Sequence, residues 1–118
     1  MAKLTVKGSV RFREFTPAML HMLVRAERFA RMIQDVDEIV VTSANDSTHG
    51  VGSKHYVDLA LDFRTHNWPT RERRRWFRRA LEEVFGPQFR CLLENESTDN
   101  EHVHAQVRKG HTYTLEPF

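Results

Sequence analysis

Cysteine and long apolar runs are the two features that this chain most conspicuously lacks. Its 118 residues contain one cysteine, Cys91, and no apolar run long enough to cross a membrane. One cysteine excludes a disulfide framework within the chain and a zinc site built mainly from thiolates. Any zinc site must therefore use histidine and carboxylate side chains. Residues 1–7 also lack the apolar core of a signal peptide, so we expect synthesis in the cytoplasm without an export signal.

Net charge is small as well, because eighteen basic residues face sixteen acidic ones and leave a formal charge of +2. The hydrophobic content of 40% is enough to fill one core in a chain of this length. We therefore expect a single folded domain over residues 1–118 rather than a disordered chain. The sequence leaves the oligomeric state open.

Capping residues and apolar periodicity predict two helices. Thr16 is a good N-cap residue, Pro17 suits the first helical position, and helical spacing of apolar residues continues to about residues 34–35. Thr70 can cap a second helix, which Gly86 and Pro87 would stop. Strands are predicted within residues 3–15 and at 39–42, 57–63, 89–93 and 102–107, with loops at 44–54 and 94–100. This order favours an α+β domain with a mainly antiparallel sheet and two main helices packed on it.

The first stretch whose residues could bind a metal or substrate runs from Ser53 to Asp62. His55 lies at the end of a predicted loop, and Asp62 follows seven residues later in an otherwise apolar strand. Full extension would separate these two residues by more than ~20 Å, so a shared metal requires a turn between them, most naturally at Asp58. A buried carboxylate needs a strong partner, and a metal ion is one.

The second stretch runs from Glu101 to His104, at the start of the last predicted strand. A zinc peptidase needs three protein ligands, an open position for water, and a carboxylate that takes the proton of that water. A glutamate three residues before a liganding histidine could reach such a water. His102 and His104 share one strand face, so one could be a ligand and the other a transition-state partner or a support for the ligand.

Together the two stretches resemble the motifs of the zinc D-Ala-D-Ala carboxypeptidases and dipeptidases, S-x-H-x-x-G-x-A-x-D followed by E-x-x-H. Phage L-alanyl-D-glutamate endolysins and the Hedgehog signalling domain share this pattern. The resemblance covers roughly residues 38–108 and implies a Hedgehog/DD-peptidase-like fold. The matching residues are Ser53, His55, Ala60, Asp62, Glu101 and His104.

The resemblance also implies roles for these residues. His55, Asp62 and His104 would bind Zn2+, Glu101 would act as general base and then as general acid, and Ser53 would position the substrate carboxylate or a ligand. The substrate would be a peptide of bacterial peptidoglycan, reached after phage-type release. The chain would then be a metallopeptidase of the carboxypeptidase or endolysin type, with the cleaved bond (D-Ala-D-Ala, L-Ala-D-Glu or a cross-link) left open.

Two departures from the family pattern affect these expectations. Asp58 stands where the family has glycine, and it adds negative charge near the expected metal. The arginine that stabilises the oxyanion in the dipeptidases is missing from residues 44–47, so His102, His49 or Asn45 would have to replace it. Both departures favour the alternative of a zinc-stabilised binding module on the same scaffold, with weak or no turnover.

Six arginines crowd the second predicted helix. They could bind an anionic partner such as nucleic acid, or they could form a solvated face whose aliphatic stems cover apolar surface. Glutamates in the same helix offset part of the charge, and no aromatic platform interleaves on the outer face, so we expect no nucleic-acid partner. The arginines are Arg71, Arg73, Arg74, Arg75, Arg78 and Arg79.

Overall fold

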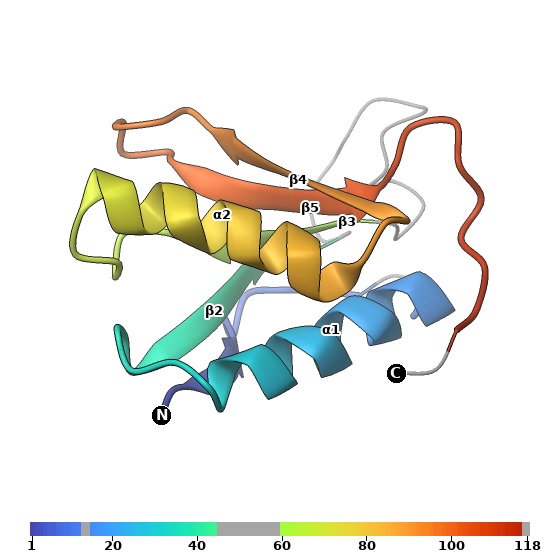
Figure 1. Ribbon diagram of the computed structural model, residues 1–118, viewed down its shortest axis with the longest axis horizontal. Coiled ribbons are helices and arrows are strands. Elements are labelled where there is room, and N and C mark those ends of the chain that lie inside the picture. Colours follow the sequence, from blue (N-terminus) through green and yellow to red (C-terminus); the bar gives the residue numbers. More distant parts are fainter. Residues whose placement is uncertain (13–14, 45–59, 117–118) are drawn as a thin grey trace.

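Five strands and two helices make up the part of the chain that the computed structural model describes, residues 1–12, 15–44 and 60–116 (Figure 1). In chain order the elements are β1 (Lys3–Val6), α1 (Pro17–Ala30), β2 (Glu38–Ser43), β3 (Ala60–Arg64), α2 (Arg71–Phe85), β4 (Phe89–Glu94) and β5 (His102–Val107). The α+β class predicted from the sequence is confirmed. No helix of these described residues is long and apolar enough to span a membrane.

The strands form one mixed sheet in the order β1-β2-β3-β5-β4. The pairs β2–β3, β3–β5 and β4–β5 are antiparallel, whereas β1 runs parallel to β2. A parallel pair needs a crossover connection, and α1 supplies it between β1 and β2. The sheet is therefore mainly antiparallel, as predicted, with one parallel pair at the β1 edge.

Helix α1 begins where the sequence predicts and ends earlier. The Thr16 side chain accepts a hydrogen bond from the Met19 backbone N–H at 3.2 Å, and Pro17 occupies the first turn. The predicted end near residues 34–35 is wrong, because the helix stops at Ala30 and the chain tightens into i→i−3 hydrogen bonds. Ile33 still packs into the core, but from this turn rather than from the helix.

Helix α2 follows its prediction closely. Thr70 caps it by accepting from the Arg73 backbone N–H at 3.1 Å, and Gly86 ends it with a φ of +97°, a conformation that glycine adopts without steric cost. Phe77, Leu81 and Phe85 recur every four residues and are fully buried. This spacing places one apolar stripe of α2 against the sheet.

Side chains of the sheet alternate between a buried face and a polar face. Val103, Ala105 and Val107 of β5 are fully buried, whereas the residues between them are partly exposed. Both helices lie on the buried side of the sheet and cover its core (Figure 1). The described part of β3 begins at Ala60, so the predicted strand positions 57–59 lie outside the described residues.

Candidate functional site

The face of the sheet opposite the helices carries a group of polar side chains from three adjacent strands, which we call the polar face. Strand β5 lies in the centre, with β3 on one side and β4 on the other. In the strand register, Asp62 lies across from His104, while Arg64 and Glu94 flank His102 on its two sides. The polar face consists of Asp62, Arg64, Glu94, His102, His104 and Gln106.

Asp62 and His104 are in direct contact although 42 positions separate them in the sequence. Asp62 Oδ1 lies 2.9 Å from His104 Nδ1, and both side chains are largely buried, with 16% and 12% of their surface exposed. The other ring nitrogen, Nε2, lies 2.8 Å from Gln106 Oε1. The imidazole is therefore fixed from both sides.

The surroundings of His104 favour its protonated form. Burial alone would lower the pKa of His104. The hydrogen bonds to Asp62 and Gln106, together with the negative charges of Asp62 and Glu94, outweigh burial and raise that pKa. Asp62 Oδ1 and His104 Nδ1 thus converge at one place on the polar face.

His102 connects this pair to a second carboxylate. Its Nε2 lies 2.9 Å from Glu94 Oε1 and 4.0 Å from Asp62 Oδ1, and its Nδ1 lies 2.8 Å from the carbonyl oxygen of Asn100. A backbone carbonyl only accepts hydrogen bonds, so Nδ1 carries a hydrogen. His102 therefore holds the Glu94 carboxylate on the same side of the sheet as Asp62 and His104.

Several predicted site residues lie outside the described part of the chain. The predicted metal ligand His55 and the predicted substrate-binding residues Ser53, Asn45 and His49 all fall within residues 45–59. Within residues 1–12, 15–44 and 60–116, no group of three or more histidine, cysteine, aspartate or glutamate residues could hold a metal ion. The described residues thus bring together two of the three predicted ligands, and the placement of the third stays a prediction.

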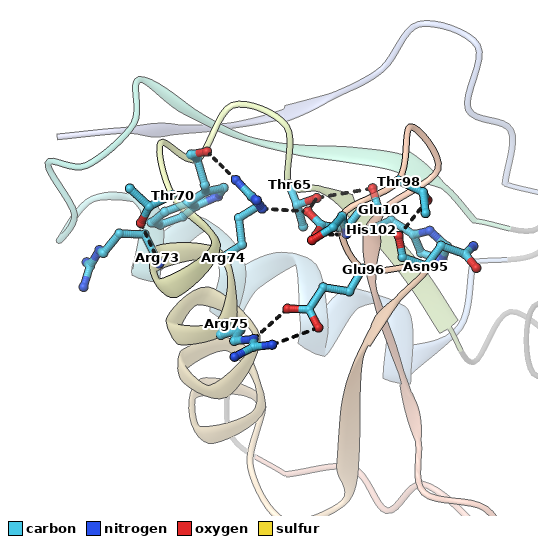
Figure 2. A network of polar contacts seen from close by, with 12 residues as sticks. Thr65, Thr70, Arg73, Arg74, Arg75, Asn95, Glu96, Thr98, Glu101 and His102 are labelled. Carbon is cyan, nitrogen blue, oxygen red and sulfur yellow. Dashed lines mark hydrogen bonds and ion pairs between the residues drawn. The ribbon is translucent and has the colours of Figure 1, made fainter.

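Glu101, the predicted general base, points to the helix side of the sheet rather than to the polar face (Figure 2). It is only 5% exposed. One carboxylate oxygen accepts from the Thr65 hydroxyl and lies 2.9 Å from Arg74 Nε, although that N–H is not aligned as a hydrogen bond. The other oxygen accepts from the Ser97 backbone N–H at 2.9 Å. Glu101 therefore ties β5 to α2 and to the β4–β5 connection.

The charge state of Glu101 follows from these contacts. Burial alone would raise the pKa of Glu101. The hydrogen bonds from Thr65 and Ser97 and the positive charge of Arg74 outweigh burial and hold that pKa below its usual range. The carboxylate is consequently ionised at neutral pH, accepts hydrogen bonds from Thr65 and Ser97, and faces the positive charge of Arg74.

A small cavity of about 300 Å³ lies beside Glu101. Its lining includes His66 and Arg74 together with the loop residues Ser97, Thr98 and Asp99. Ser97 has a φ of +65°, and the loop is closed by hydrogen bonds such as that from the Thr98 hydroxyl to the Asn95 carbonyl at 2.7 Å. None of the cavity residues belongs to the polar face, so Glu101 and the Asp62–His104 pair face different surroundings.

The arginines of α2 mainly bind other parts of this chain. Arg75 donates to Glu96 at 2.6 Å, and Figure 2 shows both guanidinium contacts to that carboxylate. Arg73 pairs with Asp35 at 2.6 Å, and Arg78 donates to the Cys91 carbonyl at 3.1 Å. With Arg74, four of the six arginines have such partners. These four arginines thus join α2 to other elements of the described structure, and the absence of a nucleic-acid partner stays a prediction.

A larger groove of about 650 Å³ lies between α1 and α2, in the helix layer. Its lining includes the apolar residues Phe29, Met32 and Trp76 and the basic residues Arg25 and Arg79. No residue predicted to bind metal or substrate lines this groove. The groove is therefore a feature separate from the predicted chemistry.

Sequence analysis did not single out Glu94 or Arg64, and the strand register explains why. Glu94 was assigned to a polar loop, yet it is the last residue of β4 and lies across from His102. Residues facing one another in antiparallel strands share a face, but their positions in the sequence do not reveal the register. The alternation of β3 was the one available signal, because it places Arg64 on the same face as Asp62.

Comparisons with protein-family models, with curated protein sequences and with solved structures returned no match to this chain.

Proposed function

We propose that this chain is a zinc-dependent peptidase that hydrolyses peptide bonds in bacterial peptidoglycan, of the D-Ala-D-Ala or L-Ala-D-Glu type. The proposal includes a Hedgehog/DD-peptidase-like version of the α+β fold and action on the cell wall after phage-type release. Its principal support is the contact between Asp62 Oδ1 and His104 Nδ1 at 2.9 Å. Two residues that the family resemblance assigns to one metal thus converge from different strands.

The two described donors are of kinds that zinc binds. Zinc sites in catalytic proteins commonly combine histidine nitrogens with a carboxylate oxygen and keep one position open. Asp62 and His104 provide one donor atom of each kind, and Gln106 orients the histidine from its other nitrogen. His55 would be the third ligand. Zinc, when bound, would lower the pKa of a water molecule and polarise the scissile carbonyl.

Cationic and hydrogen-bonding side chains on the polar face would hold the peptide. Arg64 lies across from His102 on neighbouring strands, so a positive charge stands beside the proposed ligands without any arginine in residues 44–47. Arg64 is therefore the described residue best placed to stabilise the oxyanion of the tetrahedral state, because both ring nitrogens of His102 already contact Glu94 and Asn100. Glu101 contributes through the stability of β5, because its carboxylate already accepts two hydrogen bonds and pairs with Arg74.

Metal analysis and substrate digestion test the proposal together. Purified protein should contain one zinc per chain, and His104→Ala and Asp62→Ala should lose it, because each removes one donor atom. His111→Ala is a matched control, since His111 is exposed and lies outside the polar face. Wild-type protein should release peptides from peptidoglycan, detected by mass spectrometry. A zinc-free wild type, or a His104→Ala variant with full zinc content, would refute the metal site.

One observation favours a second candidate, a zinc-stabilised binding module without turnover. The glutamate that the family resemblance assigns as base is buried and engaged with Arg74, Thr65 and Ser97. A binding module predicts that zinc-loaded protein sediments with insoluble peptidoglycan and releases no peptide. Release of peptides that stops after His104→Ala would instead support the peptidase.

A further inference from the structure

A carboxylate outside the family motif lies on the polar face, beside the proposed zinc ligands. Glu94 Oε1 is 2.9 Å from His102 Nε2, and the same nitrogen is 4.0 Å from Asp62 Oδ1. Glu94 and His102 are register partners on β4 and β5. Glu94 therefore faces the same space as Asp62 and His104, which Glu101 does not.

Glu94 is also the more accessible of the two glutamates. Its side chain is 42% exposed, whereas that of Glu101 is 3% exposed. In the described part of the chain, the Glu94 carboxylate has a single hydrogen-bonding partner, His102. The Glu101 carboxylate, by contrast, accepts two hydrogen bonds and also faces the Arg74 guanidinium. A group that transfers protons must reach the reacting atoms, so exposure and free acceptor positions favour Glu94.

We propose that Glu94, positioned by His102, is the general base and then the general acid of the hydrolysis, and that Glu101 is a structural anchor. This assignment rests on the proposed peptidase function. Glu94 takes one proton from the attacking water while the water oxygen forms a bond to the scissile carbonyl carbon. The same proton then passes to the amide nitrogen as the C–N bond breaks, which yields a carboxylic acid, still carrying the second proton of the water, and an amine.

His102 is a positioning residue in this scheme. Its Nδ1 is held by the Asn100 carbonyl at 2.8 Å, so the ring cannot turn without losing that hydrogen bond. Its Nε2 then fixes where the Glu94 carboxylate lies. The β4–β5 connection thus sets the direction of Glu94 through backbone and imidazole contacts.

Paired isosteric variants test the assignment. Glu94→Gln should fold with an unchanged melting temperature and zinc content, and its kcat on peptidoglycan fragments should fall by at least about 100-fold, the usual loss when a general base is removed. Glu101→Gln should melt at a lower temperature and keep its kcat at temperatures where it is folded. Glu96→Gln, in the same connection, should match the wild type in all three measurements.

A second measurement is independent of turnover. In metal-free protein labelled with ¹⁵N-histidine, the ring signals of His102 should shift in Glu94→Gln and stay unchanged in Glu96→Gln. Wild-type kcat in Glu94→Gln, or an unmoved His102 signal, would overturn the assignment while leaving a zinc-loaded, active wild type intact. Absence of zinc and of hydrolysis in the wild type would instead overturn the proposed function, and the assignment with it.

Discussion

Replacing Glu101 by alanine should destabilise the protein more than the loss of any surface charge. The variant removes the carboxylate that accepts from the fully buried Thr65 hydroxyl and the Ser97 backbone N–H and that faces the Arg74 guanidinium. Removing one partner of a buried ion pair costs about 3–5 kcal/mol, because the remaining charge stays desolvated. For a domain of this size we expect the melting temperature to fall by roughly 12–20 °C.

Urea denaturation at neutral pH measures this loss directly, and Glu96→Ala provides the matched control. Glu96 also pairs with an arginine of α2, but its side chain is 31% exposed and that of Arg75 is 51% exposed. Exposed pairs contribute about 0–1 kcal/mol to the free energy of unfolding. If Glu101→Ala lost no more stability than Glu96→Ala, the anchoring role of Glu101 would be refuted.

A double-mutant cycle separates the ion pair from the other contacts of Glu101. Arg74→Ala should also be destabilising, because it removes the cation that faces the buried carboxylate. Combining it with Glu101→Ala should cost less than the two single losses added together, since neither charge is then left alone in the core. Strict additivity would show that Arg74 and Glu101 do not interact in solution.

Two further predictions concern pH and thiol chemistry. The folded-state pKa of Glu101 is lowered. Its ionised carboxylate therefore stabilises the fold above the ordinary glutamate pKa, and this contribution is lost as pH falls through the lowered value. Urea titrations at pH 7 and pH 3 should show a smaller loss of unfolding free energy on acidification in Glu101→Gln than in the wild type. Cys91 is buried, and burial raises the pKa of its thiol. A thiol-specific reagent should therefore label Cys91 only as fast as the protein unfolds. Immediate labelling in native buffer would contradict the buried position of Cys91.

The secondary structure was largely predictable because local signals carry it. Thr16 and Thr70 form the expected N-caps, and Gly86 ends α2 with a positive φ. Alternation in β5 placed His102 and His104 on one face, which the structure confirms. The end of α1 was not predictable in the same way. Ile33 continues the helical spacing of apolar residues, but it is buried in the turn that follows the helix. Apolar spacing alone does not distinguish such a turn from a further helical turn.

The contacts of the candidate site were harder to predict, because they depend on strand register and on distant charges. Asp62 and His104 could be grouped through the family motifs, but their contact arises from the pairing of β3 with β5. The partner of Glu101 comes from α2, where Arg74 was one of six similar arginines in the sequence. No periodicity identifies which arginine of such a helix reaches a particular carboxylate.

Strand geometry explains why the two glutamates serve different sides of the sheet. Residues three apart on an extended strand point in opposite directions, so a glutamate three positions before His104 reaches the same face only if the backbone turns sharply between them. Here β5 begins immediately after Glu101, and the carboxylate meets Arg74 on the helix side. Glu94 instead reaches the polar face through cross-strand pairing with His102, which places paired side chains on one face whatever their separation in sequence. Under the proposed function, hydrolysis at Asp62 and His104 would therefore draw its base from the carboxylate that the β4–β5 register supplies, and shortening the β4–β5 connection so that Asn100 is lost should weaken hydrolysis, because the Asn100 carbonyl holds His102 Nδ1.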